Sequence, residues 1–239
     1  MPSTDLMSAL VISSVTFMPQ WRQEFSRQAG GTPRVADIGP EVWTAKIGVG
    51  IMSNDDAVSA AAIINQMRGS LGTFYVWDPR RQYPRMDPDG STIGSNIVTI
   101  YALGSDNKSL QLTGLPAGYQ IRRGDRLCWD QVSAPRISRC FHEFCADATA
   151  SAGGVLPLTE VSPHIRAGAT TGLVVTLRRP AAEMMMVPGS FDFPSAGTVI
   201  SSLLFSAVQV PVGVAGVGSL NQVALKFNHP ANSQYLGAL

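Results

Sequence analysis

The stretch LPAGYQIRRGDRL, residues 115–127, decides the fold class of this chain. It holds two turn signals, Pro116-Ala117-Gly118 and Gly124-Asp125, because proline fixes one backbone angle and glycine accepts positive φ. Apolar and polar residues alternate between and after the turns, the apolar ones being Tyr119, Ile121, Leu127 and Trp129. Alternation bounded by turns is typical of a half-buried antiparallel strand pair, which we predict here.

Short apolar runs bounded by turns continue on both sides of this stretch. They cover residues 97–101, 110–112, 136–146, 155–161 and 173–177. Six or seven short strands at this spacing are typical of a small barrel or sandwich. We therefore expect a small β-barrel, OB-like or similar, in this part of the chain.

The N-terminal part of the chain predicts further strands. An apolar strand over 10–17 is expected to end at Pro19, since proline interrupts a strand's hydrogen bonding. A polar, basic connection with a turn at Gly30-Gly31 is expected over 21–33. The next strand, over 36–51, is predicted to have both faces partly covered.

One helix is expected after these strands. Ser53 predicts the N-cap, with Asp55 and Asp56 in the first turn, where negative charge suits the helix dipole. Apolar residues follow at helical spacing: Ala57, Ala60, Ala61, Ile64 and Met67. Gly69 is expected at the C′ position. The aromatic run over 71–78 is the strongest strand by composition.

A loop rich in Pro, Asp, Arg and Gly at 80–94 separates two strand-rich regions. Residues 199–211 alternate again and are expected to return and pair with the first region. We predict a mainly β fold: a sandwich- or barrel-like domain with one α-helix at 1–90, completed by 188–211, and an inserted barrel at 95–182. Residues 212–239, rich in Gly and Ala, are expected to form an arm that becomes ordered against a neighbour.

Composition argues against several classes of protein. A net charge of +1 without blocks of like charge disfavours a specific nucleic-acid binder. No apolar run approaches the roughly 18 residues of a membrane span, and the first residues lack the positive region of a secretory signal. Three cysteines leave one unpaired in any disulfide scheme, which suits a reducing cytoplasm.

Cys140, His142 and Cys145 are the nearest approach to a metal-binding set. Residues 140 and 142 share one face if this segment is a strand, but a structural zinc needs a fourth ligand at a suitable spacing. We therefore favour buried structural cysteines and an exposed histidine over a metal site, and the sequence does not assign a role to Cys128, Cys140 or Cys145. No metal or cofactor is predicted.

The chain carries no motif for nucleophilic catalysis, and we do not predict an enzyme. Two carboxylate pairs could face a cleft, Asp125 with Asp130 and Glu143 with Glu160, but turn or solvated strand positions explain them more simply. The arginine pairs at 80–81 and 122–123 are expected on a solvent face or an interface. The three methionines at 184–186 fit either core filling or an adaptable contact surface.

The order of motifs resembles that of tail proteins of long-tailed phages and prophages. The motifs are Trp43-Thr44-Ala45, the helix, RGSLGTFYVWDP at 68–79, LPAG to GDRL at 115–127, VSPHIR at 161–166 and Arg179-Pro180. Within that group the chain is most similar to distal tail or baseplate-hub proteins, over roughly residues 10–210.

The resemblance implies a first β-domain that forms a ring continuing the tail tube, and a barrel-like second domain that projects outward. The ring would be a hexamer, or alternatively a trimer. Its partners would be copies of itself, the tail tube protein, the baseplate hub, and tail fibre or receptor-binding proteins. The implied location is the virion tail, assembled in the cytoplasm of the host bacterium, with no catalytic residues.

Two other functions stay open from the sequence. A carbohydrate-binding module would use Tyr101, Tyr119 or Trp129 as stacking platforms, although aromatics of this size are more often core. A tail-associated hydrolase would need a cleft with two close carboxylates or a bound metal.

Overall fold

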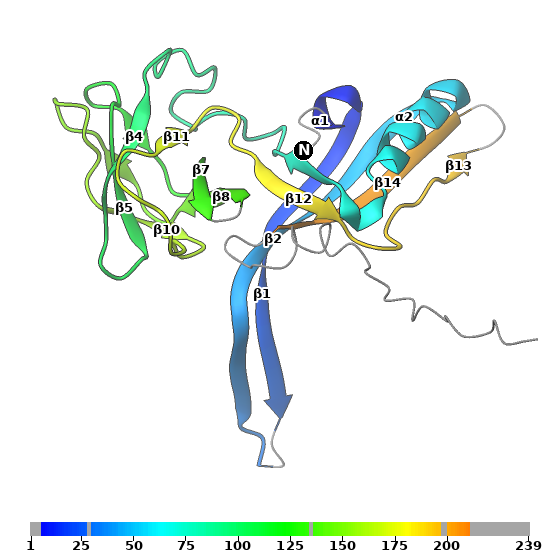
Figure 1. Ribbon diagram of the computed structural model, residues 1–239, viewed down its shortest axis with the longest axis horizontal. Helices are drawn as coiled ribbons and strands as arrows, with labels where there is room; N and C mark the ends of the chain where they lie inside the picture. The colour runs from blue at the N-terminus through cyan, green and yellow to red at the C-terminus, as the bar shows by residue number, and fades with distance from the viewer. Residues whose placement is uncertain (1–5, 28–29, 134–135, 197–199, 211–239) are drawn as a thin grey trace, which may run out of the picture.

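The computed structural model describes residues 6–27, 30–133, 136–196 and 200–210 (Figure 1). The fold is mainly β, with an open antiparallel sheet that carries the helices and a closed six-stranded antiparallel barrel beside it. No helix within these residues is long and apolar enough to cross a membrane.

The open sheet has the strand order β1-β2-β14-β12-β3, with β13 paired to β14. Its strands are β1 (Ile12–Arg27), β2 (Pro33–Ser53), β3 (Thr73–Val76), β12 (Ala182–Met186), β13 (Ser195–Ala196) and β14 (Ile200–Gln209). The pairing of β14 with β2 runs from Ile200↔Ser53 to Val208↔Thr44. The returning segment therefore lies in the middle of the sheet, next to the N-terminal strands.

Strand β1 does not end at Pro19, and the polar connection expected over 21–33 is wrong. β1 continues to Arg27, and Pro19 pairs with Trp43 within the β1–β2 ladder. β1 is the edge strand of the sheet, where a residue without an N–H group is tolerated because no outer neighbour needs it.

Two α-helices and one 3₁₀ turn accompany the sheet: α1 (Leu6–Ala9), α2 (Asn54–Gln66) and η1 (Gly69–Leu71). Ser53 caps α2 as expected, its Oγ accepting a hydrogen bond from the Asp56 amide at 3.2 Å. The left-handed residue after the C-cap Met67 is Arg68 (φ 54°), not Gly69, whose φ is also positive at 63°. α1 was not predicted, because a single turn carries no periodic signal.

One face of the sheet packs against α1 and α2. Its core includes Phe17, Trp43, Ile47, Phe74, Met184, Leu203 and Phe205 from the strands, with Leu6, Ala57, Ala61 and Ile64 from the helices. Alanine on α2 lets the helix approach the strands closely, as the sequence predicts. Two of the three consecutive methionines, Met184 and Met186, fill this core.

The barrel closes in the order β10-β5-β4-β11-β7-β8. Its strands are β4 (Val98–Leu103), β5 (Ser109–Thr113), β7 (Arg126–Ser133), β8 (Arg136–Phe144), β10 (Thr159–Ser162) and β11 (Val174–Thr176). All the pairs between them are antiparallel. Figure 1 places this barrel to one side of the sheet, with β7 and β8 nearest to it.

Both predicted turns around residue 120 exist, but the strand pair between them does not. The Tyr119 amide donates to the Pro116 carbonyl, and the Asp125 amide to the Arg122 carbonyl. The short strand β6 (Gln120–Ile121) pairs with β9 (Ala148–Thr149), while β7 pairs with β8 and β11. Local alternation identified the strands and could not identify these distant partners.

The loop before the barrel is organised by the buried carboxylate of Asp87. It accepts hydrogen bonds from the amides of Thr92 and Ile93, each at 3.0 Å, and from the Tyr119 hydroxyl at 3.2 Å. Three donors satisfy a charge that would otherwise be expensive to bury. The loop is thereby fixed to the barrel core.

Phe205 tests the packing of the sheet against its helices. It is fully buried and contacts Phe74 edge-on, with ring centroids 6.0 Å apart. We expect Phe205→Ala to lower the free energy of unfolding by about 3–5 kcal/mol, measured by urea denaturation. Leu204→Ala, on the opposite face of the same strand, should change it by less than about 1 kcal/mol. Equal losses would contradict the assignment of the two faces.

Candidate interaction surfaces

The most prominent surface is the outer half of the β1–β2 ribbon, residues 20–27 and 33–40, which we call the hairpin arm. Its ladder runs from Arg22↔Gly39 to Arg27↔Pro33. Figure 1 shows the arm projecting away from the rest of the sheet and from the barrel. No side chain within these two ranges is buried.

The arm carries large apolar side chains that are more than half exposed to solvent. Trp21, Phe25 and Val35 are each 58% exposed and Ile38 is 61% exposed. Phe25 and Val35 lie directly opposite each other in the ladder. An isolated two-stranded ribbon is marginally stable in water, and several large apolar side chains exposed on one such ribbon are typical of an interaction site. The arm therefore has the properties of a segment that packs against another protein.

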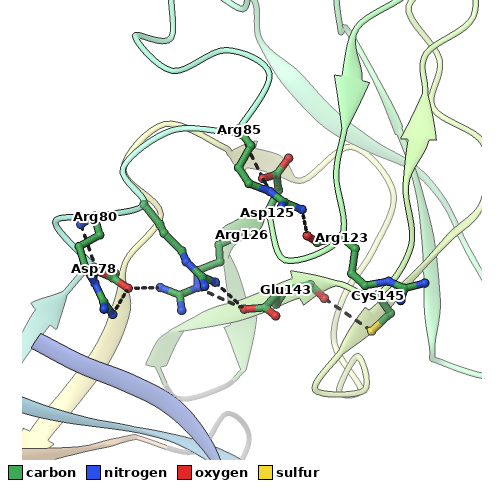
Figure 2. Close-up of polar contacts among 9 residues, drawn as sticks. Asp78, Arg80, Arg85, Arg123, Asp125, Arg126, Glu143 and Cys145 are labelled. Atoms are coloured by element: carbon green, nitrogen blue, oxygen red, sulfur yellow. Dashed lines mark hydrogen bonds and ion pairs between the residues drawn. The ribbon is translucent and has the colours of Figure 1, made fainter.

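A second feature is a buried ion cluster where the barrel meets the sheet, which we call the junction. Arg126, at the start of β7, donates through Nη1 to Asp78 (3.2 Å) and through Nε to Glu143 (3.4 Å). The side chains of Arg126 and Asp78 are 4% and 0% exposed. Arg80 adds a two-pronged contact to Asp78, with both distances 3.0 Å (Figure 2).

The Arg126 guanidinium also lies against aromatic rings from both parts of the molecule. Its carbon is 4.8 Å from the ring centroid of Phe17 in β1, 5.4 Å from that of Trp43 in β2 and 6.0 Å from that of Phe141 in β8. The three rings also contact one another, with centroids 5.1–5.2 Å apart. The junction thus joins barrel and sheet through one shared core.

The pKa values at the junction reflect burial and pairing. Burial alone would raise the pKa of Asp78, but hydrogen bonds from Arg80 and the charge of Arg126 outweigh it and hold this pKa below its ordinary value. Burial lowers the pKa of Arg126, an effect that the neighbouring Asp78 opposes. The lowered pKa keeps Asp78 ionised at neutral pH, where its carboxylate faces the Arg126 guanidinium.

A pocket of about 420 Å³ opens beside the junction, lined by Arg80, Arg81, Arg85, Arg126 and several prolines. Each of these arginines already has a carboxylate partner. Arg81 lies 3.7 Å from Glu143, and Arg85 lies 3.6 Å from Asp125 while also donating to the Arg123 carbonyl (Figure 2). The four arginines share three carboxylates, so each positive charge is paired within the molecule and the loop is connected to the barrel.

Cys140, His142 and Cys145 were the residues considered as metal ligands. Within the described ranges, no group of three or more His, Cys, Asp or Glu side chains is arranged to hold a metal ion. Cys128 and Cys140 are buried and Cys145 is half-buried, all as free thiols. Burial raises the pKa of each thiol, to about 12 for Cys140, so none is a thiolate at neutral pH.

His142 is buried, so the expectation of an exposed histidine at this position is wrong. Its ring stacks on Trp129, with centroids 4.5 Å apart and planes 10° from parallel. Nδ1 donates a hydrogen bond of 2.7 Å to the Pro163 carbonyl. Burial lowers the pKa of His142 to about 4, so the ring is neutral at physiological pH.

The four carboxylates considered for catalysis lie in a turn, in ion pairs or on an exposed strand position. Asp125 is buried and accepts from the amides of Arg85 and Arg122, which makes it the turn residue expected. Asp130 is exposed and pairs with Arg139 on the facing strand. Glu143 belongs to the junction, and Glu160 is exposed on β10. Their roles in turns and ion pairs agree with the simpler interpretation of the sequence.

Two of the three aromatic side chains considered for stacking on a glycan lie inside the barrel. Tyr119 and Trp129 are 4% and 1% exposed, whereas Tyr101 is 58% exposed. Burial, followed by the nearby charge of Asp87, raises the pKa of the Tyr119 hydroxyl. A sugar could reach Tyr101 alone among the three.

The sequence predicts neither the arm nor the junction. The arm gives no signal because Trp21 and Phe25 are surrounded by polar residues, a pattern that predicts a connection instead of a strand. The junction depends on Asp78 and Arg126, which lie 48 positions apart, so no local pattern reports their pairing. The GDRL motif contains Arg126 and could at most have marked it as an arginine placed at the start of a buried strand.

The junction predicts unequal roles for two arginines that share one carboxylate. Arg126→Met removes a buried partner and leaves Asp78 in a dry site, so we expect a loss of about 3 kcal/mol in the free energy of unfolding. Arg80→Met removes a side chain that is 68% exposed and should cost about 1 kcal/mol or less. Urea denaturation of both variants measures the difference, and similar losses would argue against a buried junction.

His142 predicts a loss of stability in mild acid. Its folded-state pKa is about 4, below the ordinary value of 6.5, so the unfolded chain binds the proton more tightly. Stability is therefore complete above about pH 6.5 and falls as the pH is lowered toward 4. We expect a loss of about 2 kcal/mol between pH 7 and pH 5.

The control for this prediction is His142→Phe, which keeps a ring on Trp129 and removes the titrating group. Thermal or urea unfolding as a function of pH should show a flatter dependence for this variant across the same range. An unchanged slope would assign the acid sensitivity to other groups.

Comparison with known proteins adds no assignment for this chain. No family model matches it, and no curated protein matches it either. Its function has to be inferred from the surfaces that the molecule exposes.

Proposed function

We propose that this chain is a structural virion protein of the tail tip of a long-tailed phage or prophage. In this proposal it forms a ring that joins the tail tube to the baseplate and the receptor-binding apparatus. The order of sequence motifs suggests this class, and the hairpin arm is the structural feature that supports it most directly.

The arm supports assembly because its exposed apolar groups need a partner. Trp21, Phe25, Val35 and Ile38 extend on a ribbon that no other described element covers. Large aromatics of this kind dominate the energy of protein interfaces once they are buried. A ribbon that projects from a rigid sheet suits contact between subunits better than it suits binding of a small molecule.

A closed ring requires two different surfaces on each subunit, because each copy contacts one neighbour on either side. The subunit is strongly asymmetric, with the arm at one end of the sheet and the barrel to one side (Figure 1). A hexamer is favoured and a trimer is the alternative. The sheet and its arm would form the ring, and the barrel would project outward.

The partners proposed are other copies of the chain, the tail tube protein, the baseplate hub, and tail fibre or receptor-binding proteins. The protein would be assembled in the cytoplasm of the host bacterium and reside in the virion tail. No catalytic step is assigned to it, since Asp125, Asp130 and Glu143 are engaged in a turn or in ion pairs and Glu160 is exposed on a strand.

The test is the mass of the native protein. We expect the purified chain to self-associate, giving a discrete ring-sized species in native mass spectrometry and rings in electron micrographs. The triple change Trp21→Ser, Phe25→Ser and Val35→Ser, the arm variant, should weaken self-association by roughly 100-fold or more while leaving the fold intact.

The matched control changes exposed apolar residues on the barrel. Ile137 and Val174 are 66% and 58% exposed, so Ile137→Ser with Val174→Ser removes exposed apolar surface from the barrel, away from the arm. This control should assemble like the wild type. A wild-type protein that stays monomeric at high concentration, and that is missing from purified particles, would exclude the proposed function.

A further inference from the structure

The sheet carries an open groove on the face opposite its helices. The start of β1, the far end of β2, the segment 192–194 and the start of β14 line it, and its volume is about 580 Å³. Leu204 lies in it, opposite Gly48 in the β14–β2 ladder and bridged to Asp192. The neighbours of Leu204 in β14, Leu203 and Phe205, are buried in the core beneath.

Gly48 and Gly50 lie at the floor of the groove, beneath the N-terminal segment. A Cβ atom at Gly48 would lie 2.4 Å from Ser14 Oγ, and one at Gly50 would lie 3.5 Å from the Val11 carbonyl oxygen, so residues of this segment already cover both glycines. Gly50 is half-buried, and its amide donates to the Val11 carbonyl. The rim is apolar, with Ile51 72% and Leu204 46% exposed. The surface that the groove offers to another molecule is thus this rim.

We propose that this groove receives the hairpin arm of a neighbouring copy of the chain. This inference rests on the proposed function and names the second of the two surfaces that a ring requires. The arm of one subunit would place Phe25, Val35 or Trp21 against Ile51 and Leu204 of the next subunit.

The arm cannot fill the groove of its own subunit. Both lie on the same strand, because β2 runs from Pro33 in the arm to Ser53 beside the groove. A strand rises roughly 3.3 Å per residue, so Val35 and Ile51 are separated by about 50 Å. Figure 1 shows that the arm extends away from the sheet and does not turn back. The contact therefore has to form between molecules.

The two surfaces also match in chemical character. The arm combines exposed apolar residues with three arginines and two acids, Arg22, Arg27 and Arg34 against Glu24 and Asp37, for a net charge of +1. The groove is mainly apolar and contains one charged side chain, Asp192. Asp192 is exposed and forms no ion pair within the described part of the chain. An arm arginine next to this carboxylate would fix the orientation of the contact.

A contact of arm into groove is head-to-tail, so an open chain of subunits keeps one free arm and one free groove until the ring closes. This property allows a test with two defective proteins. The arm variant keeps its groove, whereas the groove variant, Ile51→Glu with Leu204→Glu, keeps its arm. Circular dichroism and thermal unfolding establish that both are folded, and the changed groove residues are exposed in the wild type.

Each variant alone is expected to be a monomer, with self-association weakened by roughly 100-fold or more. Mixed in equal amounts, they should form a 1:1 heterodimer that grows no further, because the only intact contact is between one good arm and one good groove. Native mass spectrometry measures both results. Ile137→Glu with Val174→Glu, the matched control on the barrel, should still form the full assembly.

A second measurement does not depend on disruptive changes. A photo-crosslinking phenylalanine analogue at position 25 should crosslink between subunits to peptides that contain residues 48–51 or 202–204. Crosslinks to residues 211–239, to another tail protein, or to any other part of the chain would overturn the inference.

The failures of the two proposals are distinguishable. If the wild type forms rings but the groove variant does too, or if the mixture gives no heterodimer, the ring stands and the groove is not its contact. If the wild type never self-associates, the proposed function falls and this inference falls with it.

Discussion

The pairing of β1 with β2 is the constraint on which the rest of the molecule depends. Its inner half is held by core packing, with Val15, Phe17, Ala45 and Ile47 buried in the core of the sheet. A slip of one residue would turn these side chains to solvent, so the core fixes the register of the whole ribbon. The outer half is held by the pairing of β1 with β2 and continues the register that the core fixes. The arm therefore exposes a defined set of residues.

The junction with Arg126 orients the barrel against this ribbon. A buried ion pair adds little stability compared with well-packed apolar groups, but it forms only in one geometry. Here the guanidinium must reach Asp78 and Glu143 while lying against rings of β1, β2 and β8. Arm, groove and barrel therefore belong to one connected body, and a subunit presents all three surfaces in fixed directions.

The sequence predicted what local rules control. The two turns around residue 120, the cap at Ser53 and the alternation of β14 all follow from neighbouring residues. Prediction from the sequence failed where contacts between distant residues determine the structure. β6 pairs with β9 and not with its neighbour in sequence. His142 is buried because its ring stacks on Trp129. The prediction for residues 21–33 failed for another reason. Sequence patterns assume that apolar residues are buried, whereas Trp21 and Phe25 are exposed, so the pattern predicts a connection where the chain forms a strand.

An exposed apolar ribbon would promote aggregation unless other features limit it. Unpaired strand edges recruit other chains, and natural proteins counter this with charge, proline and short length. The arm has charged residues on both strands and prolines at both ends of its β2 half, Pro33 and Pro40. These features disfavour continuous edge-to-edge pairing and leave side-chain packing as the available mode of contact. A head-to-tail contact gives a ring when the rotation between subunits closes and an open filament when it does not, so the direction in which the arm projects would decide between the two.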